Sequence, residues 1–196
     1  GFACGSCPEH AELAKQARLA HTDAPAPVGL GLSADRLYHR GHTWVEPGPE
    51  GTWTVGLDEF AARCCGKPDL LNLPEPGEQV KAGERCVKLQ RGSLAARFPS
   101  PIAGEVTEIG GPTDGWLYRV RPRGAAAGTE HLLSRDEARI WLMRELEWLQ
   151  GRLGGADESA GETGMAADGG APVDDLIAAC PDADWDGIWS QVSLEV

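Results

Sequence analysis

Three side chains near the start of the chain have the types and spacing for metal or thiol chemistry. Cys4 and Cys7 are two residues apart, and His10 follows them. Thiolate and imidazole are the ligands that zinc prefers, but a structural zinc site takes four ligands, and the next candidate is the distant His21. Pro8 excludes the c-type haem pattern, which needs His directly after the second Cys. A zinc site, a redox pair at a helix N-terminus and an inert segment all stay open.

The other cysteines and histidines offer no comparable pattern. Cys64 and Cys65 are adjacent at the end of a predicted short helix, where core packing is the expected role of a buried thiol. His39 and His131 have no partner that the sequence identifies. No Ser-His-Asp or Cys-His arrangement occurs at a recognisable spacing, so we expect no catalytic residue and no enzyme.

The elements that must position these groups fall into five predicted segments. Residues 1–22 form a helical segment with the Cys motif, and residues 23–34 form a Pro- and Gly-rich linker. Residues 35–153 contain short strands separated by turn residues and end in a helix. Ser134 and Glu137 form a capping box at the start of that helix. The spacing of the turns predicts a mostly-β sandwich or barrel with helical decoration.

The last two segments are acidic. Residues 154–171 read as a flexible linker and residues 172–196 as a tail with two short amphipathic helices. The apolar positions of the second helix are Trp185, Ile188, Trp189 and Val192. Helices this short need a surface to pack on. They either fold back onto the body or present the two tryptophans to a groove on a partner protein.

The charge is concentrated in this tail. From Leu153 onward there are ten Asp and Glu and no Lys or Arg, within a formal net charge of −12 for 196 residues. Phosphate binding needs a basic stripe, and none is visible, so nucleic acid is not an expected ligand. No apolar run is long enough to span a bilayer, so we expect no membrane partner. The six cysteines form no disulfide framework, which favours a cytoplasmic location.

Several blocks within residues 36–150 resemble the H protein of the glycine cleavage system. They occur in the family's order: "HTWV" (42–45), "TVGLDEFAARCCGKPDLLNLPEPGEQVKAGE" (54–84), "SPIAGEV" (100–106) and "GWLYRVRP" (115–122). The resemblance implies a barrel-sandwich hybrid, the lipoyl-domain fold, with a C-terminal helix and short flanking helices. It also implies a structural role for His42 and a barrel-filling role for Trp44.

The family carries lipoate on a lysine at the tip of a protruding hairpin, and this chain departs from the family there. Counting back without a gap from Pro101 places Ser93 at the lysine position. Lys88 lies five residues upstream, inside the incoming strand. A hydroxyl cannot form the amide, so we expect Ser93 to be unmodified and no cofactor to be bound. Ser93-Leu94 also matches the attachment dipeptide of phosphopantetheine carriers, but those carriers are helical bundles and a plain turn serine is favoured.

The family's acidic excursion before its Gly-Trp-Leu strand is also shortened here, to "TEIGGPTD" (107–114). The leading hypothesis is therefore an H-protein-like domain that has lost lipoylation and serves as an interaction or scaffold module. Its expected partners are proteins, among them glycine cleavage enzymes or a dehydrogenase-type complex. One alternative is a genuine or recently decayed lipoyl carrier. The other is a redox or metal module built on Cys4 and Cys7.

Overall fold

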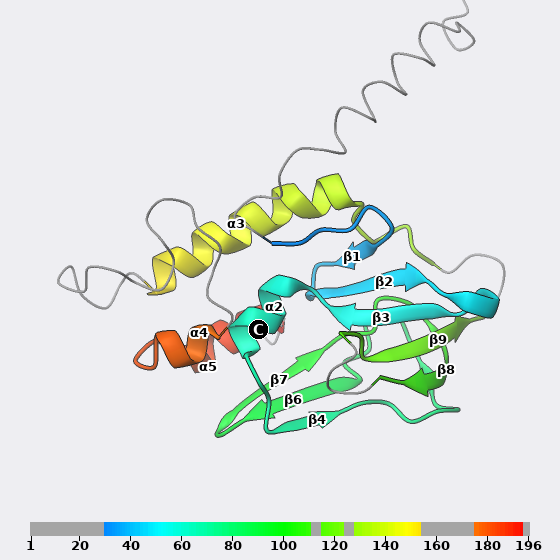
Figure 1. Ribbon diagram of the computed structural model, residues 1–196, viewed down its shortest axis with the longest axis horizontal. Coiled ribbons are helices and arrows are strands. Elements are labelled where there is room, and N and C mark those ends of the chain that lie inside the picture. Colours follow the sequence, from blue (N-terminus) through cyan, green and yellow to red (C-terminus); the bar gives the residue numbers. More distant parts are fainter. Residues whose placement is uncertain (1–29, 111–114, 124–127, 154–174, 194–196) are drawn as a thin grey trace, which may run out of the picture.

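The computed structural model describes residues 30–110, 115–123, 128–153 and 175–193 as two antiparallel sheets with helices along one side (Figure 1). The larger sheet has the order β1-β2-β3-β9-β8-β5. Its strands are β1 (Leu37–His39), β2 (Thr43–Pro47), β3 (Trp53–Leu57), β9 (Tyr118–Pro122), β8 (Gly104–Ile109) and β5 (Gln79–Val80). The smaller sheet has the order β4-β6-β7, formed by β4 (Leu70–Asn72), β6 (Val87–Arg91) and β7 (Leu94–Phe98). The predicted mostly-β fold class is confirmed.

The helices lie beside these sheets and begin and end at recognisable signals. Their bounds are η2 (Pro49–Gly51), α2 (Glu59–Cys65), α3 (Arg135–Leu153), α4 (Leu176–Ala179) and α5 (Trp185–Val192). The predicted capping box precedes α3, where the carboxylate of Glu137 accepts from the backbone N–H of Ser134 at 2.8 Å. Gly66 ends α2 with a φ of +58°, which glycine adopts without strain. No helix in the described ranges is both long and apolar enough to cross a membrane.

The core follows from the alternation of side chains along the strands. Val87 and Leu89 of β6, with Ala96 and Phe98 of β7, point inward from the smaller sheet and are buried. The helix α3 closes the other side of the core with its leucine stripe. That stripe consists of Leu142, Leu146, Leu149 and Leu153. The same continuous core includes the apolar side chains of α4 and α5.

Trp44 shows how closely the larger sheet is packed. Its ring is buried, and its indole N–H donates to the carbonyl of Leu57 at 2.7 Å. A Cβ on Gly56 would lie 2.3 Å from the ring, so only glycine leaves room for it there. The guanidinium of Arg36 covers the ring at 3.7 Å from its centroid, a cation–π geometry. Trp44 is therefore part of the buried core, packed against β3 and covered by Arg36.

Candidate functional site at the β6–β7 hairpin

The strands β6 and β7 form a hairpin whose turn consists of Gly92 and Ser93. Arg91 pairs with Leu94 on either side of that turn. Gly92 has a φ of +56°, as tight two-residue hairpins require, and Ser93 is exposed. The backbone N–H of Gly92 donates to a carboxylate oxygen of Asp69 at 2.7 Å, which fixes the turn against the segment before β4. The structure thus places Ser93 at the apex of a well-supported hairpin.

No amine stands at this apex. Lys88 pairs with Arg97, four residue pairs back from the turn, and is half-buried. Bringing Lys88 to the position of Ser93 would shift the strand by five residues, an odd number, which would turn the buried Val87 and Leu89 outward. The turn residues therefore do not fit an amide-linked group.

The hydroxyl of Ser93 also lacks a base that would make it a nucleophile. Its side chain makes no hydrogen bond within the described part of the chain. His42 cannot serve, because it is buried with its Nδ1 2.8 Å from a carboxylate oxygen of Asp58. Its ring packs between Phe60 and Trp141, with centroid distances of 4.8 and 4.6 Å. Among the described residues, the site therefore presents a plain alcohol with no base hydrogen-bonded to it.

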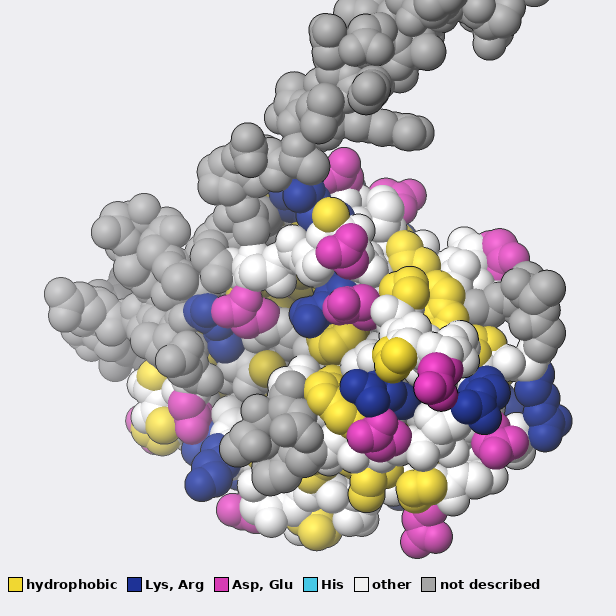
Figure 2. Space-filling view, turned by 45° about the vertical axis from the view of Figure 1, so that its right-hand side comes forward, with side chains coloured by type: hydrophobic (Ala, Val, Ile, Leu, Met, Phe, Trp, Pro, Cys, Tyr) yellow, Lys and Arg dark blue, Asp and Glu magenta, His cyan; other side chains and the backbone are white. Residues whose placement is uncertain are grey.

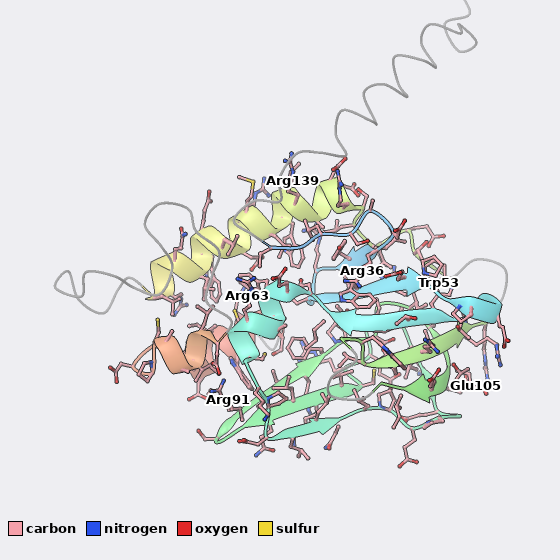
Figure 3. All side chains as sticks on the ribbon, viewed as in Figure 1. Arg36, Trp53, Arg63, Arg91, Glu105 and Arg139 are labelled. Atoms are coloured by element: carbon pink, nitrogen blue, oxygen red, sulfur yellow. The ribbon has the colours of Figure 1, made fainter. Side chains whose placement is uncertain are left out.

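The turn end of the hairpin is held by the C-terminal tail (Figure 3). Arg91, beside the turn, donates to Asp175 at 2.8 Å and to the carbonyl of Cys65 at 3.3 Å. This hydrogen bond and charge lower the pKa of the Asp175 carboxyl, while the carboxylate raises the pKa of Arg91. Asp175 also caps α4 by accepting from the backbone N–H of Ala178. Arg91 therefore joins the hairpin to the start of the tail by an ion pair and to the end of α2 by a hydrogen bond.

The four tail residues predicted to anchor a partner are instead buried within the chain. Trp185, Ile188, Trp189 and Val192 are each 5% exposed or less. The indole N–H of Trp189 donates to the carbonyl of Cys64 at 3.3 Å. Burying the apolar face of α5 against the adjoining core is favourable in free energy, whereas exposing it to water is not. The tail therefore folds back onto the body. These side chains are unavailable to another protein while the tail is seated.

Of the six cysteines, Cys4 and Cys7 were predicted for metal or redox chemistry and Cys64 and Cys65 for core packing. Cys4, Cys7 and His10 lie outside the described residues, as do the rest of the predicted segment 1–22, residues 23–29 of the first predicted linker and all of the second, 154–171. Cys64 and Cys65 are buried free thiols, and burial raises the pKa of both, which makes them poor thiolates. Within the described ranges, no three His, Cys, Asp or Glu side chains gather to hold a metal ion.

A histidine pair was missed by the sequence reasoning. His39 and His131 meet edge to face, with ring centroids 5.7 Å apart. Burial, followed by the neighbouring histidine charges, lowers the pKa of His39 to about 4. The Nδ1 of His39 accepts from the backbone N–H of Gly41 at 2.9 Å, and His131 Nε2 lies 2.9 Å from the carbonyl of Pro101. The two positions are far apart in the sequence, and no local signal joins them.

These features define a class: a small two-sheet β domain that presents an exposed hairpin turn. The glycine cleavage H-protein family matches residues 36–145, just over half of the chain. The chain is similar to the glycine cleavage system H protein of Streptomyces coelicolor, with 34% identity over 113 residues, covering 51% of this chain and 88% of the relative. The corresponding protein of Pseudoalteromonas translucida is 31% identical over 119 residues, covering 54% and 92%.

Among solved structures, a glycine cleavage system H protein from Mycobacterium marinum is similar, with a TM-score of 0.48 and 27% identity. The match covers 57% of this chain and 99% of that one. The chain belongs to the glycine cleavage H-protein family. The tail helices α4 and α5 lie outside the residues that the family matches.

Proposed function

We propose that this chain is an H-protein-like domain that has lost lipoylation and acts as a non-catalytic interaction or scaffold module. The observation that carries the proposal is the exposed Ser93 at the turn of the β6–β7 hairpin. In the family this position holds the lysine that bears lipoate.

The argument rests on the chemistry of the attachment. An amide to lipoate requires an amine, and Ser93 offers a hydroxyl whose ester would hydrolyse readily. Lys88 has an amine, but it lies four residue pairs from the turn and is half-buried. The short connection between β8 and β9 is a second departure from the family, in a loop, where function resides more often than in the scaffold.

The remaining scaffold is suited to binding other proteins. Its hairpin and core are fully formed, so any surface that recognises a partner can persist without the cofactor. We propose a protein partner, either an enzyme of glycine cleavage or a dehydrogenase-type complex, and a cytoplasmic setting. The chain itself then catalyses no reaction.

Intact-mass measurement tests this proposal. The full chain is co-expressed with a lipoate ligase in medium containing lipoate, and its mass should equal that of the unmodified sequence. The variant Ser93→Lys serves as the positive control, because it restores an amine at the turn without changing the hairpin pairing. A lipoyl increment on the wild-type chain would overturn the proposal.

The alternative is a carrier that has decayed recently, and the intact hairpin geometry favours it. If Ser93→Lys accepts lipoate and supports glycine cleavage with the other components of the system, only the attachment residue has been lost. If Ser93→Lys accepts lipoate but does not support glycine cleavage, the docking surface has diverged as well, as the scaffold proposal expects.

A further inference from the structure

The β6–β7 hairpin is positively charged, although the protein as a whole is acidic. From Val87 to Gly104 there are three Lys and Arg and no Asp or Glu, in a chain of net charge −12. Arg91 is neutralised by Asp175, but Lys88 and Arg97 remain. No ion pair joins either of these two cations to an acid among the described residues.

These two cations lie directly opposite each other on the outward side of the smaller sheet. The strand register pairs Lys88 with Arg97, and the buried Val87, Leu89, Ala96 and Phe98 point the other way. We call the outward side the basic face. Its residues are Leu70, Asn72, Lys88, Gln90, Ala95 and Arg97. Like charges directly opposite each other destabilise a strand pair, so this arrangement costs folding free energy.

The basic face is open on the described structure. Figure 1 shows β4, β6 and β7 on the side of the molecule away from α3, with no described helix over their outward surface. On the side of the molecule that Figure 2 shows, several Lys and Arg lie beside Asp and Glu. The basic face, by contrast, contains no acid at all, and Asn72 and Gln90 beside the cations supply further donors.

We propose that the basic face is a docking surface for an acidic segment of a partner protein. The proposal rests on the proposed role as an interaction module and names the surface and the partner's chemistry. Two cations at the spacing of adjacent strands, flanked by amides and the small Ala95, match carboxylates presented by an extended or flat surface. A nucleic acid fits less well, because binding its phosphate backbone needs a longer basic stripe than the two cations of this face provide.

Binding of labelled poly-L-glutamate to the full-length protein, followed by fluorescence anisotropy at low ionic strength, tests the docking surface. Lys88→Gln/Arg97→Gln should weaken binding about tenfold, since two charged contacts are lost. The matched control Lys81→Gln/Arg144→Gln removes the same charge from exposed positions outside the basic face and should bind like wild type. Added salt should weaken the wild-type interaction.

Four outcomes would overturn the proposal. The first is that the wild-type protein does not bind poly-L-glutamate, and the second is that both double variants lose binding equally. The third is that Lys88→Gln/Arg97→Gln loses affinity for duplex DNA but keeps its affinity for poly-L-glutamate. The fourth is binding that appears only after the five acids of residues 154–174 are changed to amides, which would make the chain's own segment the occupant. None of these measurements detects lipoylation. A negative result for the docking proposal therefore leaves the proposed loss of the cofactor untouched, and the reverse also holds.

Discussion

At the scale of single residues, one carboxylate supports two parts of the fold. Asp58 caps α2 by accepting from the backbone N–H of Ala61 at 2.8 Å, and its other oxygen lies 2.8 Å from His42 Nδ1. His42 has a φ of +57°, an uncommon conformation for a residue other than glycine. The buried pair and the rings of Phe60 and Trp141 hold that conformation. His42 is therefore a structural residue, in line with the role that the family resemblance implied.

His39 makes the stability of the protein depend on pH. Its pKa is lowered to about 4 in the folded chain, from an ordinary value of 6.5, so the unfolded chain binds its proton more readily. Stability should be highest above pH 6.5 and should fall as the pH decreases toward 4. His39→Asn keeps an acceptor for Gly41 without a titrating ring, so it should flatten the dependence between pH 7 and pH 5. Urea midpoints across that range provide the measurement.

The control for this prediction is His131→Asn, because His131 is exposed and lies against the same ring. It should leave most of the pH dependence in place, since burial is the largest cause of the lowered pKa of His39. An unchanged slope in His39→Asn would mean that other groups cause the acid sensitivity.

At the scale of elements, the tail completes the end of α2. The last carbonyls of a helix lack partners within it, and those of Cys64 and Cys65 accept from Trp189 and Arg91 respectively. Trp189, the donor to Cys64, and Asp175, the ion-pair partner of Arg91 beside the hairpin turn, both lie outside the family-matched region. The tail is a structural component of this particular chain.

Trp189→Ala should lower the free energy of unfolding by about 3–5 kcal/mol, because it opens a large cavity and leaves the Cys64 carbonyl without its donor. Urea denaturation followed by far-UV circular dichroism measures the change. Trp148→Ala is the matched control, because this half-buried ring lies on α3. It should lower the free energy of unfolding by clearly less. Equal, small losses in both variants would show that the tail adds little to stability.

The sequence predicted those elements whose signals are local. Gly92-Ser93 between alternating residues, the capping box at Ser134 and the helix-ending Gly66 all lie within a few positions of the structure they specify. The surface on which the tail packs could not be predicted in the same way. Arg91 and Asp175 are 84 residues apart, and Trp189 and the Cys64 carbonyl 125. Periodicity identified an apolar helix face but carried no information about what it would cover.

At the scale of the whole molecule, the two sheets, α3 and the tail share one hydrophobic core. Residues from the start and the end of the described chain, such as Leu30 and Val192, belong to the same cluster of buried side chains. A shared core of this kind makes the elements depend on one another, so they should unfold together.

Amide hydrogen exchange tests this dependence along the chain. The amides of Ile188 and Trp189 in α5 should exchange as slowly as those of Val55 in β3 and Val120 in β9, because all four side chains lie in the one core. Exchange should then require global unfolding, and its free energy should match that from urea denaturation. If the α5 amides exchange much faster than those of the strands, the tail opens independently of the body. The apolar side chains of α5 and the core residues beneath them would then be accessible to solvent without global unfolding.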